Sequence, residues 1–237
     1  MKRFLDYITL DARGIKIWSI VFGLTGTIFA IILGILFYSP EQSFIQNIVP
    51  SISVPIGFLC VYYLGLRKNI GNILGFIANI LEFIVNTAFG NFGFYISTIY
   101  YGLSHVFGYI DWNKNLDADN KIKVRDLSNK RDLFILVIML IFSTIFVFIA
   151  KIIGLLPFEV TSFAFIGNIL VMYLGIVAQG TMMLRYRYAW FIWIAMNCFA
   201  IPIQFLTGNY VYGMMYCFYQ LNAFICLYAQ YHTRVEK

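Results

Sequence analysis

The segment RYAWFIWIAMN, residues 187–197, lies within a long apolar run and carries Trp190, Trp193 and Asn197 at spacings of three and four. At about 3.6 residues per turn, these three side chains fall on one face of a helix. Two indoles and a carboxamide on one face of an apolar helix can pack against neighbouring helices, or they can bind a flat polar ligand. The rest of the chain shows what surrounds this helix.

The composition places the whole chain in a membrane. Of its 237 residues 61% are hydrophobic, 19% are aromatic and only 12% are charged, too few charges for a soluble domain. Nearly uncharged stretches of about 20 residues can cross a bilayer as helices. Eight occur, at about residues 15–38, 48–66, 70–89, 91–111, 133–153, 161–184, 188–206 and 209–231. We therefore expect an all-α integral membrane protein with eight transmembrane helices.

The positions of the basic residues give the orientation of these helices. With the amino terminus in the cytoplasm, sixteen of the seventeen Lys and Arg residues fall in cytoplasmic segments, and only Lys151 falls outside. A wrong number of spans would disrupt this alternation, so the positive-inside rule predicts eight spans with both termini in the cytoplasm. Topology thus accounts for the net charge of +6, and we expect no nucleic-acid partner.

The sequence lacks the patterns of an enzyme or a cofactor protein. The two histidines and the acids show no metal spacing. The four cysteines, at 60, 198, 217 and 226, lie in apolar spans without a CxxC pattern, so we expect them to pack. The first 14 residues resemble no cleaved signal, because two acids interrupt them and no small-residue cleavage pattern follows. We expect no catalysis, no cofactor and a retained first helix.

A gap-free shift of 118 residues aligns two parts of the chain. It pairs Gly57 with Gly175, Leu66–Arg67 with Leu184–Arg185, Asn79 with Asn197, Gly90–Asn91 with Gly208–Asn209, and Tyr101 with Tyr219. The matches fall at turns and at polar positions inside spans. A single linking helix would make both units run the same way, as the charge pattern also requires.

We therefore expect a parallel 3+1+3 repeat. The predicted parts are a cytoplasmic segment at 1–14, an extra transmembrane helix and outside loop at 15–44, a first three-helix unit at 45–112, a cytoplasmic loop and linker helix at 113–160, a second unit at 161–231 and a cytoplasmic tail at 232–237.

Polar residues inside the spans are the candidates for a binding site. They are Trp190, Trp193 and Asn197 in the seventh span, Asn79 and Glu82 in the third, Tyr101 in the fourth, and Tyr212, Tyr219 and Asn222 in the eighth. The seventh-span stripe continues to Gln204, and the third-span stripe includes Asn72 and Asn86. A single Asn or Tyr in a membrane helix more often bonds to a neighbour or belongs to the interfacial belt.

Two features among these candidates point more strongly to function: the tryptophan pair with Asn197, and Glu82. Trp193 and Asn197 lie deeper than the belt, so the tryptophan pair with Asn197 favours a ligand site. Glu82 is the only acid far inside a span, where an ionisable group is either functional or a protonated carboxyl bonded to a neighbouring helix.

The pattern Trp190-x-x-Trp193-x-x-x-Asn197, with eight spans and a 3+1+3 repeat, resembles the bacterial PnuC-type vitamin transporters, which are similar in fold to the SWEET sugar transporters. The resemblance covers about residues 45–231. It implies uptake of nicotinamide riboside across the bacterial cytoplasmic (inner) membrane by facilitated diffusion, without ATP or a coupling ion, and with trapping by phosphorylation in the cytoplasm. A homo-oligomer, provisionally a trimer, is compatible with such a fold.

The chemistry of that substrate suits the candidate residues. Indoles attract a cationic ring by about 0.5–2 kcal/mol when desolvated, and Asn197 and Asn79 can bond the carboxamide or the ribose hydroxyls. Thiamine, another flat cation, would suit nearly as well, and a sensor that binds without transport is a further alternative. Proton coupling through Glu82 or His105 stays open. We expect the polar loop at 113–132 to be a solvated connector rather than a docking site.

Overall fold

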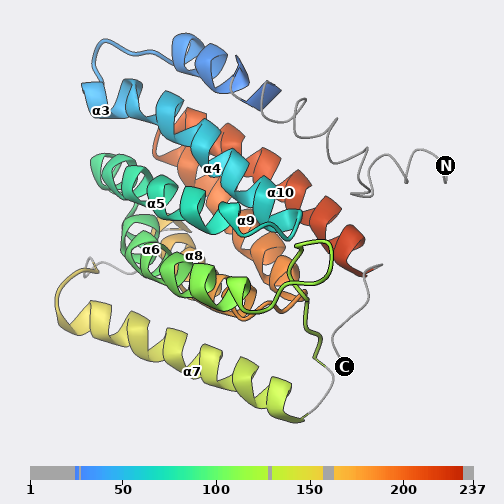
Figure 1. The fold of residues 1–237 in the computed structure, drawn as a ribbon. Helices are drawn as coiled ribbons and strands as arrows, with labels where there is room; N and C mark the ends of the chain where they lie inside the picture. The colour runs from blue at the N-terminus through green and yellow to red at the C-terminus, as the bar shows by residue number, and fades with distance from the viewer. Residues whose placement is uncertain (1–24, 27, 128–129, 157–162, 232–237) are drawn as a thin grey trace.

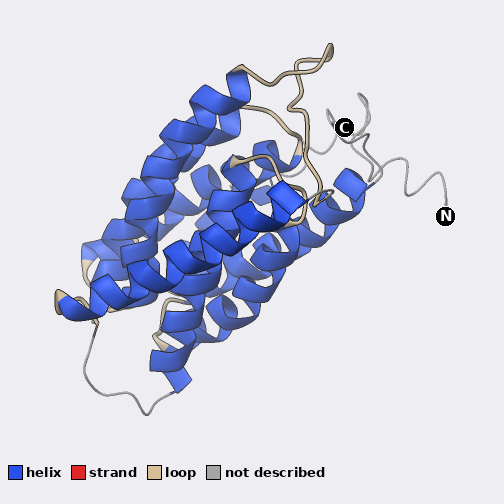
Figure 2. Cartoon of the chain, turned by 90° about the horizontal axis from the view of Figure 1, so that it is seen from below, coloured by secondary structure: helices blue, strands red, loops and turns tan. Residues whose placement is uncertain are grey.

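The computed structural model describes residues 25–26, 28–127, 130–156 and 163–231. These residues form helices joined by loops, with no β-strand among them (Figure 2). Three predicted parts fall wholly or partly outside the described residues: the segment 1–14, residues 15–24 and 27 of the predicted span 15–38, and the tail 232–237. The predicted all-α fold is confirmed for the described part of the chain.

The helices follow the predicted spans closely. After a helical stretch at 28–36 come α3 (Phe44–Asn47), α4 (Val49–Gly65), α5 (Ile70–Ala88), α6 (Phe92–Asn113), α7 (Lys130–Ile152), α8 (Phe163–Met183), α9 (Ala189–Leu206) and α10 (Tyr210–Tyr231). From α4 onward, each predicted boundary lies within three residues of the observed one. The agreement has a physical cause, because lipid offers no hydrogen-bond partners and the backbone must satisfy itself along each apolar run.

Five of the described helical segments are long and apolar enough to cross a membrane, namely Phe44–Gly65, α5, α7, α8 and α9. Helices α6 and α10 are equally long, with 22 residues each, but their tyrosines and other polar side chains lower their hydropathy. Polar side chains on these two helices indicate that they face protein or a cavity on at least one side.

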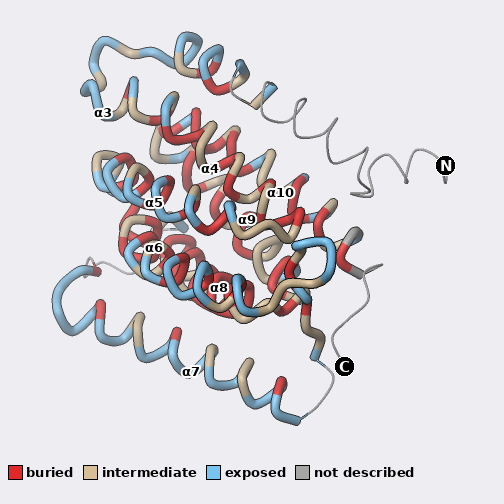
Figure 3. Tube along the Cα trace, in the orientation of Figure 1, coloured by how far each residue is buried: buried red, intermediate tan, exposed pale blue. Residues whose placement is uncertain are grey.

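Six helices form a closed ring. Each of α4, α5, α6, α8, α9 and α10 contacts the next in that order, and α10 closes the ring against α4. Helix α7 packs on α8 at one edge (Figure 1) and is exposed along most of its length (Figure 3). The stretch 28–36 lies at the opposite edge, where Phe29 packs edge-on against Phe218 of α10 at 4.8 Å between ring centroids. The ring is therefore the unit that can enclose a site.

Tight turns define the two ends of the ring. At one end, here named the arginine end, α4 and α8 are followed by Arg67 and Arg185, with φ angles of 60° and 70°. At the opposite end, named the asparagine end, α5 and α9 are followed by Gly90 and Gly208, with φ angles of 69° and 77°. In each turn the next amide donates to the carbonyl five residues earlier, a closure that requires a left-handed residue at this position.

Candidate functional site

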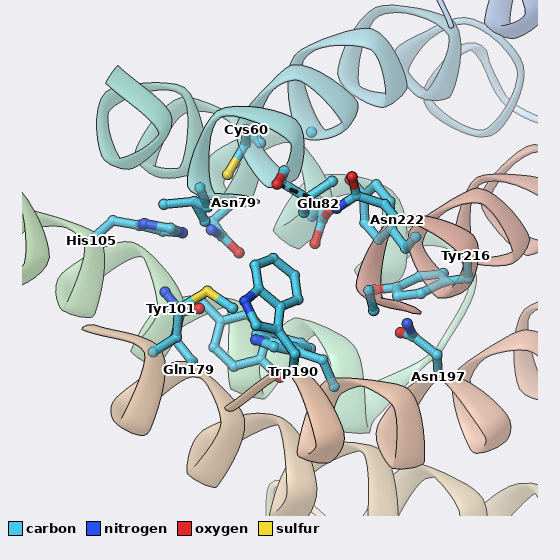
Figure 4. A pocket seen from close by; sticks show the side chains of 18 residues that line it. Cys60, Asn79, Glu82, Tyr101, His105, Gln179, Trp190, Asn197, Tyr216 and Asn222 are labelled. Carbon is cyan, nitrogen blue, oxygen red and sulfur yellow. Dashed lines mark hydrogen bonds between the residues drawn. The ribbon is translucent and has the colours of Figure 1, made fainter. Parts of the chain in front are cut away.

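The ring of helices encloses a cavity with an empty volume of about 640 Å³, which includes space open to solvent. All six ring helices contribute to its lining, which among the described residues consists of Gly57, Cys60, Val61, Leu64, Ala78, Asn79, Glu82, Tyr101, His105, Gln179, Met182, Trp190, Trp193, Asn197, Tyr216, Tyr219, Asn222 and Ala223. Figure 4 shows the labelled side chains around this common space.

Helix α9 supplies the aromatic wall of the cavity. Trp190 and Asn197 are buried, and Trp193 packs edge-on against Tyr101 of α6, with ring centroids 5.7 Å apart. The indole N–H of Trp193 and the side-chain carbonyl of Asn197 are buried without a hydrogen-bond partner in the described structure. Buried polar groups are nearly always bonded, so these two atoms are available to a ligand.

On the opposite wall, α5 and α6 hold an imidazole in place. The Asn72 amide nitrogen donates to the Asn69 side chain at 2.8 Å, so the Asn72 oxygen faces His105 Nδ1 at 2.9 Å. With this assignment of the amide, His105 donates from Nδ1 and keeps Nε2 as an acceptor. A Cβ at Gly75 would overlap the imidazole ring, so the glycine makes room for it.

Other amides in the lining are tied to the helices and leave part of their bonding capacity free. The Asn79 amide nitrogen donates to the Gly75 carbonyl at 2.7 Å, and that of Asn222 donates to Val61 at 3.3 Å. Gln179 donates to the Ser104 hydroxyl at 2.9 Å. Each side-chain oxygen can still accept a hydrogen bond from a ligand.

Eight of the nine predicted site residues line the cavity: Asn79, Glu82, Tyr101, Trp190, Trp193, Asn197, Tyr219 and Asn222. Tyr212 does not, because its hydroxyl is bonded to Ser53 Oγ at 2.5 Å in the apolar core. The sequence reasoning missed Cys60, Gln179 and Tyr216. For Tyr216 a signal was present, since it lies four residues after Tyr212 and three before Tyr219. That the lining residues bind substrate stays a prediction.

The outer parts of the two polar stripes close the asparagine end instead of lining the cavity. Gln204 donates to Asn86 Oδ1 at 2.9 Å, and its own oxygen accepts from Asn91 at 3.0 Å and from Asn209 at 2.8 Å. These four residues, here named the amide cluster, are almost completely buried. The cluster joins α5 directly to α9 across the ring.

A loop closes the arginine end. The chain from 114 to 127, here named the 114–127 loop, crosses the ends of α4 and α8, where Ile122 N–H donates to the Arg67 carbonyl at 3.0 Å and Arg125 N–H to the Arg185 carbonyl at 2.8 Å. The side chains of Ile122 and Val124 are only 1% and 3% exposed. The prediction of a solvated connector therefore fails at Ile122 and Val124, which are buried against the bundle, while the other residues of the loop keep partial or full exposure.

Ion pairs fasten the 114–127 loop and its neighbours at the arginine end. Arg185 Nε lies 3.1 Å from Asp111, Arg67 lies 3.7 Å from Asp117, and Arg187 pairs with Asp126. Arg125 pairs with Asp132 at 3.2 Å and stacks on the ring of Tyr186.

Tyr186 adds a hydrogen bond to this group of ion pairs. Its hydroxyl donates to the Asp132 carboxylate at 2.7 Å. Burial, and next this hydrogen bond, raise the pKa of Tyr186 to about 12, so the phenol stays protonated and keeps donating at neutral pH.

A second hollow lies between the cavity and the 114–127 loop. It is bounded by Arg67, Ile122 and Arg185 among others, and it shares Leu64, Met182 and Trp190 with the cavity. These three side chains are therefore the layer that separates the cavity from the loop.

The described lining of the cavity has few charged groups and no cluster of metal ligands. Glu82 is its one carboxylate, and no Lys or Arg is among the described lining residues. No group of three or more His, Cys, Asp or Glu in the described part of the chain could hold a metal ion. The lining therefore offers aromatic faces, neutral hydrogen-bonding groups and a single carboxyl.

A ring of apolar helices around a central polar cavity is the architecture of a membrane transporter. The sequence model of the nicotinamide mononucleotide transporter family matches residues 47–231, and the chain belongs to this family. The crystal structure of the vitamin B3 transporter PnuC has a similar fold, with a TM-score of 0.73 and 19% sequence identity over 91% of this chain and 93% of that chain. No curated protein sequence matches the chain.

Family membership confirms the resemblance to PnuC-type transporters that the sequence predicted. The chain is therefore a multi-pass membrane transporter and not an enzyme.

Proposed function

We propose that this transporter carries nicotinamide riboside by facilitated diffusion. The observation that carries the proposal is the α9 wall. It presents the indoles of Trp190 and Trp193 together with two unpartnered polar groups, the Trp193 N–H and the Asn197 side-chain carbonyl. The pyridinium ring of the riboside stacks on the indoles, and its carboxamide and ribose hydroxyls bond to Asn197 and Asn79. The family description and the fold of a vitamin B3 transporter support this assignment.

The charge of the lining favours the riboside over its phosphate ester, the mononucleotide in the family description. A phosphate would bring negative charge into a cavity where no Lys or Arg among the described lining residues can pair with it. Burying an unpaired anion costs several kcal/mol. The same rejection keeps the phosphorylated product in the cytoplasm, so phosphorylation there traps the vitamin.

The mechanism we propose is alternating access, with the arginine end toward the cytoplasm of a bacterium and both termini on that side, as the positive-inside rule requires. The amide cluster is then the outer closure, and the 114–127 loop with the layer of Leu64, Met182 and Trp190 is the inner one. Each closure opens in turn as the two halves of the ring rock about the cavity.

Those halves are the two units of the 3+1+3 repeat, 45–112 and 161–231, linked through 113–160 after the extra helix of 15–44. Equivalences at a separation of 118 residues support this arrangement. Asn86 and Gln204 are 118 residues apart and bond to each other, and the left-handed residues of the turns pair in the same way. A Cβ at Gly57 would meet the Tyr219 hydroxyl, and one at the equivalent Gly175 would meet that of Tyr101.

An uptake assay in liposomes tests the proposal. Purified protein should equilibrate labelled nicotinamide riboside but not the mononucleotide, and Trp193→Ala or Asn197→Ala should each reduce uptake about tenfold or more, the effect of losing about 1.4 kcal/mol of binding. Matched controls on the exposed face of the same helix, Phe191→Ala and Cys198→Ala, should leave uptake unchanged. No uptake by the wild type, or full uptake by both cavity variants, would overturn the proposal.

Thiamine is the second candidate cargo, because it too is a flat aromatic cation that suits the indole wall. Competition of unlabelled thiamine against the labelled riboside separates the two. If the protein is instead a sensor, it should bind the riboside but fail to equilibrate it across the liposome membrane. A homo-oligomer, provisionally a trimer, stays a prediction that the mass of the protein in detergent micelles can check.

A further inference from the structure

Glu82 stands in the middle of α5 with its carboxyl group at the cavity and is only 8% exposed. No ion pair or hydrogen bond reaches this carboxyl from the described residues, and no Lys or Arg lines the cavity with it. Figure 4 places it across the cavity from Trp190, beside Asn79 and Asn222.

The groups that face Glu82 do not compensate a negative charge. Titratable neighbours come from three elements: Cys60 of α4, Tyr101 and His105 of α6, and Tyr212, Tyr216 and Tyr219 of α10. Thiols and phenols are ordinarily neutral at pH 7, and no ion pair joins His105 to Glu82 in the described structure. Helices α3, α8 and α9 bring no titratable side chain to the cavity.

An isolated carboxylate in such a place costs several kcal/mol, so it is neutralised by a proton or by a positive ligand. No Lys or Arg among the described lining residues can neutralise it, which leaves the proton. A flat cation lying on the indole wall brings the second possibility, because it places its charge in the same desolvated space.

We propose that Glu82 selects the charge of the cargo, holding a proton in the empty cavity and releasing it as a monocation binds. The identity of the monocation as nicotinamide riboside rests on the proposed function. On binding, the carboxyl O–H bond breaks and the proton passes to water on the side from which the cargo entered. When the cargo leaves, the carboxylate takes up a proton from water again.

The proton release keeps the cavity electrically neutral with and without the cargo, and no covalent bond forms to the cargo. A cargo with the same shape and no charge cannot replace the proton, so it leaves Glu82 protonated and gains no electrostatic attraction. A positive charge on the cargo thus becomes a condition for tight binding, in addition to the fit of its aromatic ring against the indoles.

Calorimetry with the purified full-length protein tests the proton release directly. Titrating nicotinamide riboside in two buffers of different ionisation enthalpy should show about one proton released per riboside bound, and affinity should rise with pH by up to about tenfold per unit. Glu82→Gln, the neutral isostere, should release none and bind independently of pH. Glu82→Asp should restore the release, and Glu41→Gln, the same change at an exposed acid, should behave as the wild type.

A neutral analogue tests the selectivity. Dihydronicotinamide riboside has the same size but an uncharged ring, so the wild type should prefer the oxidised riboside by about tenfold or more, which is about 1.4 kcal/mol. Glu82→Gln should remove most of this preference.

The outcomes distinguish this inference from the proposed function. If the wild type binds neither riboside at any pH, the proposed cargo is wrong. If it binds the riboside without proton release, and Glu82→Gln keeps the preference for the charged form, the role of Glu82 is wrong while the carrier function stands.

Discussion

The two ends of the cavity are closed by different chemistry. At the asparagine end, the four side chains of the amide cluster join α5 to α9 with neutral hydrogen bonds that are buried. At the arginine end, the 114–127 loop lies over α4 and α8 and is held by backbone bonds and by partly exposed ion pairs. One closure therefore belongs to the helices that line the cavity, whereas the other is a separate piece of chain.

This difference predicts how each end opens. The amide cluster separates only when α5 and α9 move apart, because its bonds run directly between them or meet at Gln204. The loop can lift from the arginine end without such a movement. Neutral buried bonds are also insensitive to salt, while partly exposed ion pairs are weakened by it. We expect the two ends to respond to different perturbations.

Cys60 provides a native reporter for both ends, because it is a cavity-lining free cysteine. In a background with Cys198, Cys217 and Cys226 replaced by serine, a membrane-impermeant thiol reagent can reach Cys60 only through an open end. Added to one face of oriented vesicles at a time, it measures the opening of each end separately.

The largest effect is expected for Gln204→Leu. The change removes all three Gln204 contacts of the amide cluster and leaves buried amides without partners. At about 1 kcal/mol for each bond, labelling of Cys60 from the asparagine end should accelerate on the order of 100-fold. Leu206→Ala, at a lipid-exposed position of the same helix, is the control. Unchanged labelling from this end would show that the cluster is not the closure.

Ile122→Asp should have the next largest effect, confined to the arginine end. It replaces a buried apolar side chain of the 114–127 loop by a charge, and losing the burial of an isoleucine costs about 1.5–3 kcal/mol. Labelling from the arginine end should rise at least about tenfold, with the rate from the other end unchanged. Lys123→Ala, an exposed position beside it, should change neither rate. Equal acceleration from both ends would indicate general unfolding instead of loop release.

A smaller effect is expected from salt. At about 1 M ionic strength the screening length falls to about 3 Å, and each partly exposed pair contributes about 0.2–1 kcal/mol. Labelling through the arginine end should therefore accelerate by about two- to fivefold, and labelling through the asparagine end should not. Arg185→Ala should remove part of this salt response. An equal response at both ends would contradict the distinction between them.

The smallest effect is expected when Asn86 and Gln204 are exchanged. The two residues are 118 positions apart and bond to each other. If the proposed repeat makes them equivalent, the double variant Asn86→Gln, Gln204→Asn should rebuild the same bonds with the roles of α5 and α9 exchanged. Labelling from the asparagine end should stay within about threefold of the wild type, because coupled changes can compensate. Either single variant should open this end more than the pair does. If the double variant is labelled at Cys60 as fast as Gln204→Leu, positions 86 and 204 are not equivalent.

The sequence predicted the helices and their bounds better than it predicted how the two ends of the cavity are closed. Helix bounds could be located because lipid requires long apolar runs. Asn79, Asn197 and Tyr101 could be assigned to a common face by spacing and by the 118-residue shift, and all three line the cavity.

Helical periodicity could not predict how far along the cavity a side chain lies or which residue it bonds to. Asn197 and Gln204 share a stripe, yet one faces the cavity and the other is part of the amide cluster. Tyr212 shares the stripe of Tyr219 but bonds to Ser53 of α4. The burial of Ile122 and Val124 in the 114–127 loop was missed, because it depends on contacts with helices distant in sequence.

The space across from the two tryptophans is filled differently in the other half of the ring. Shifted by 118 residues, Trp190 and Trp193 correspond to Asn72 and Gly75, which hold and make room for the His105 imidazole. A molecule in the proposed cavity thus meets an indole wall on one flank and a hydrogen-bonding imidazole on the other. We therefore expect the two flanks to favour one pose of a bound molecule over the pose turned end for end.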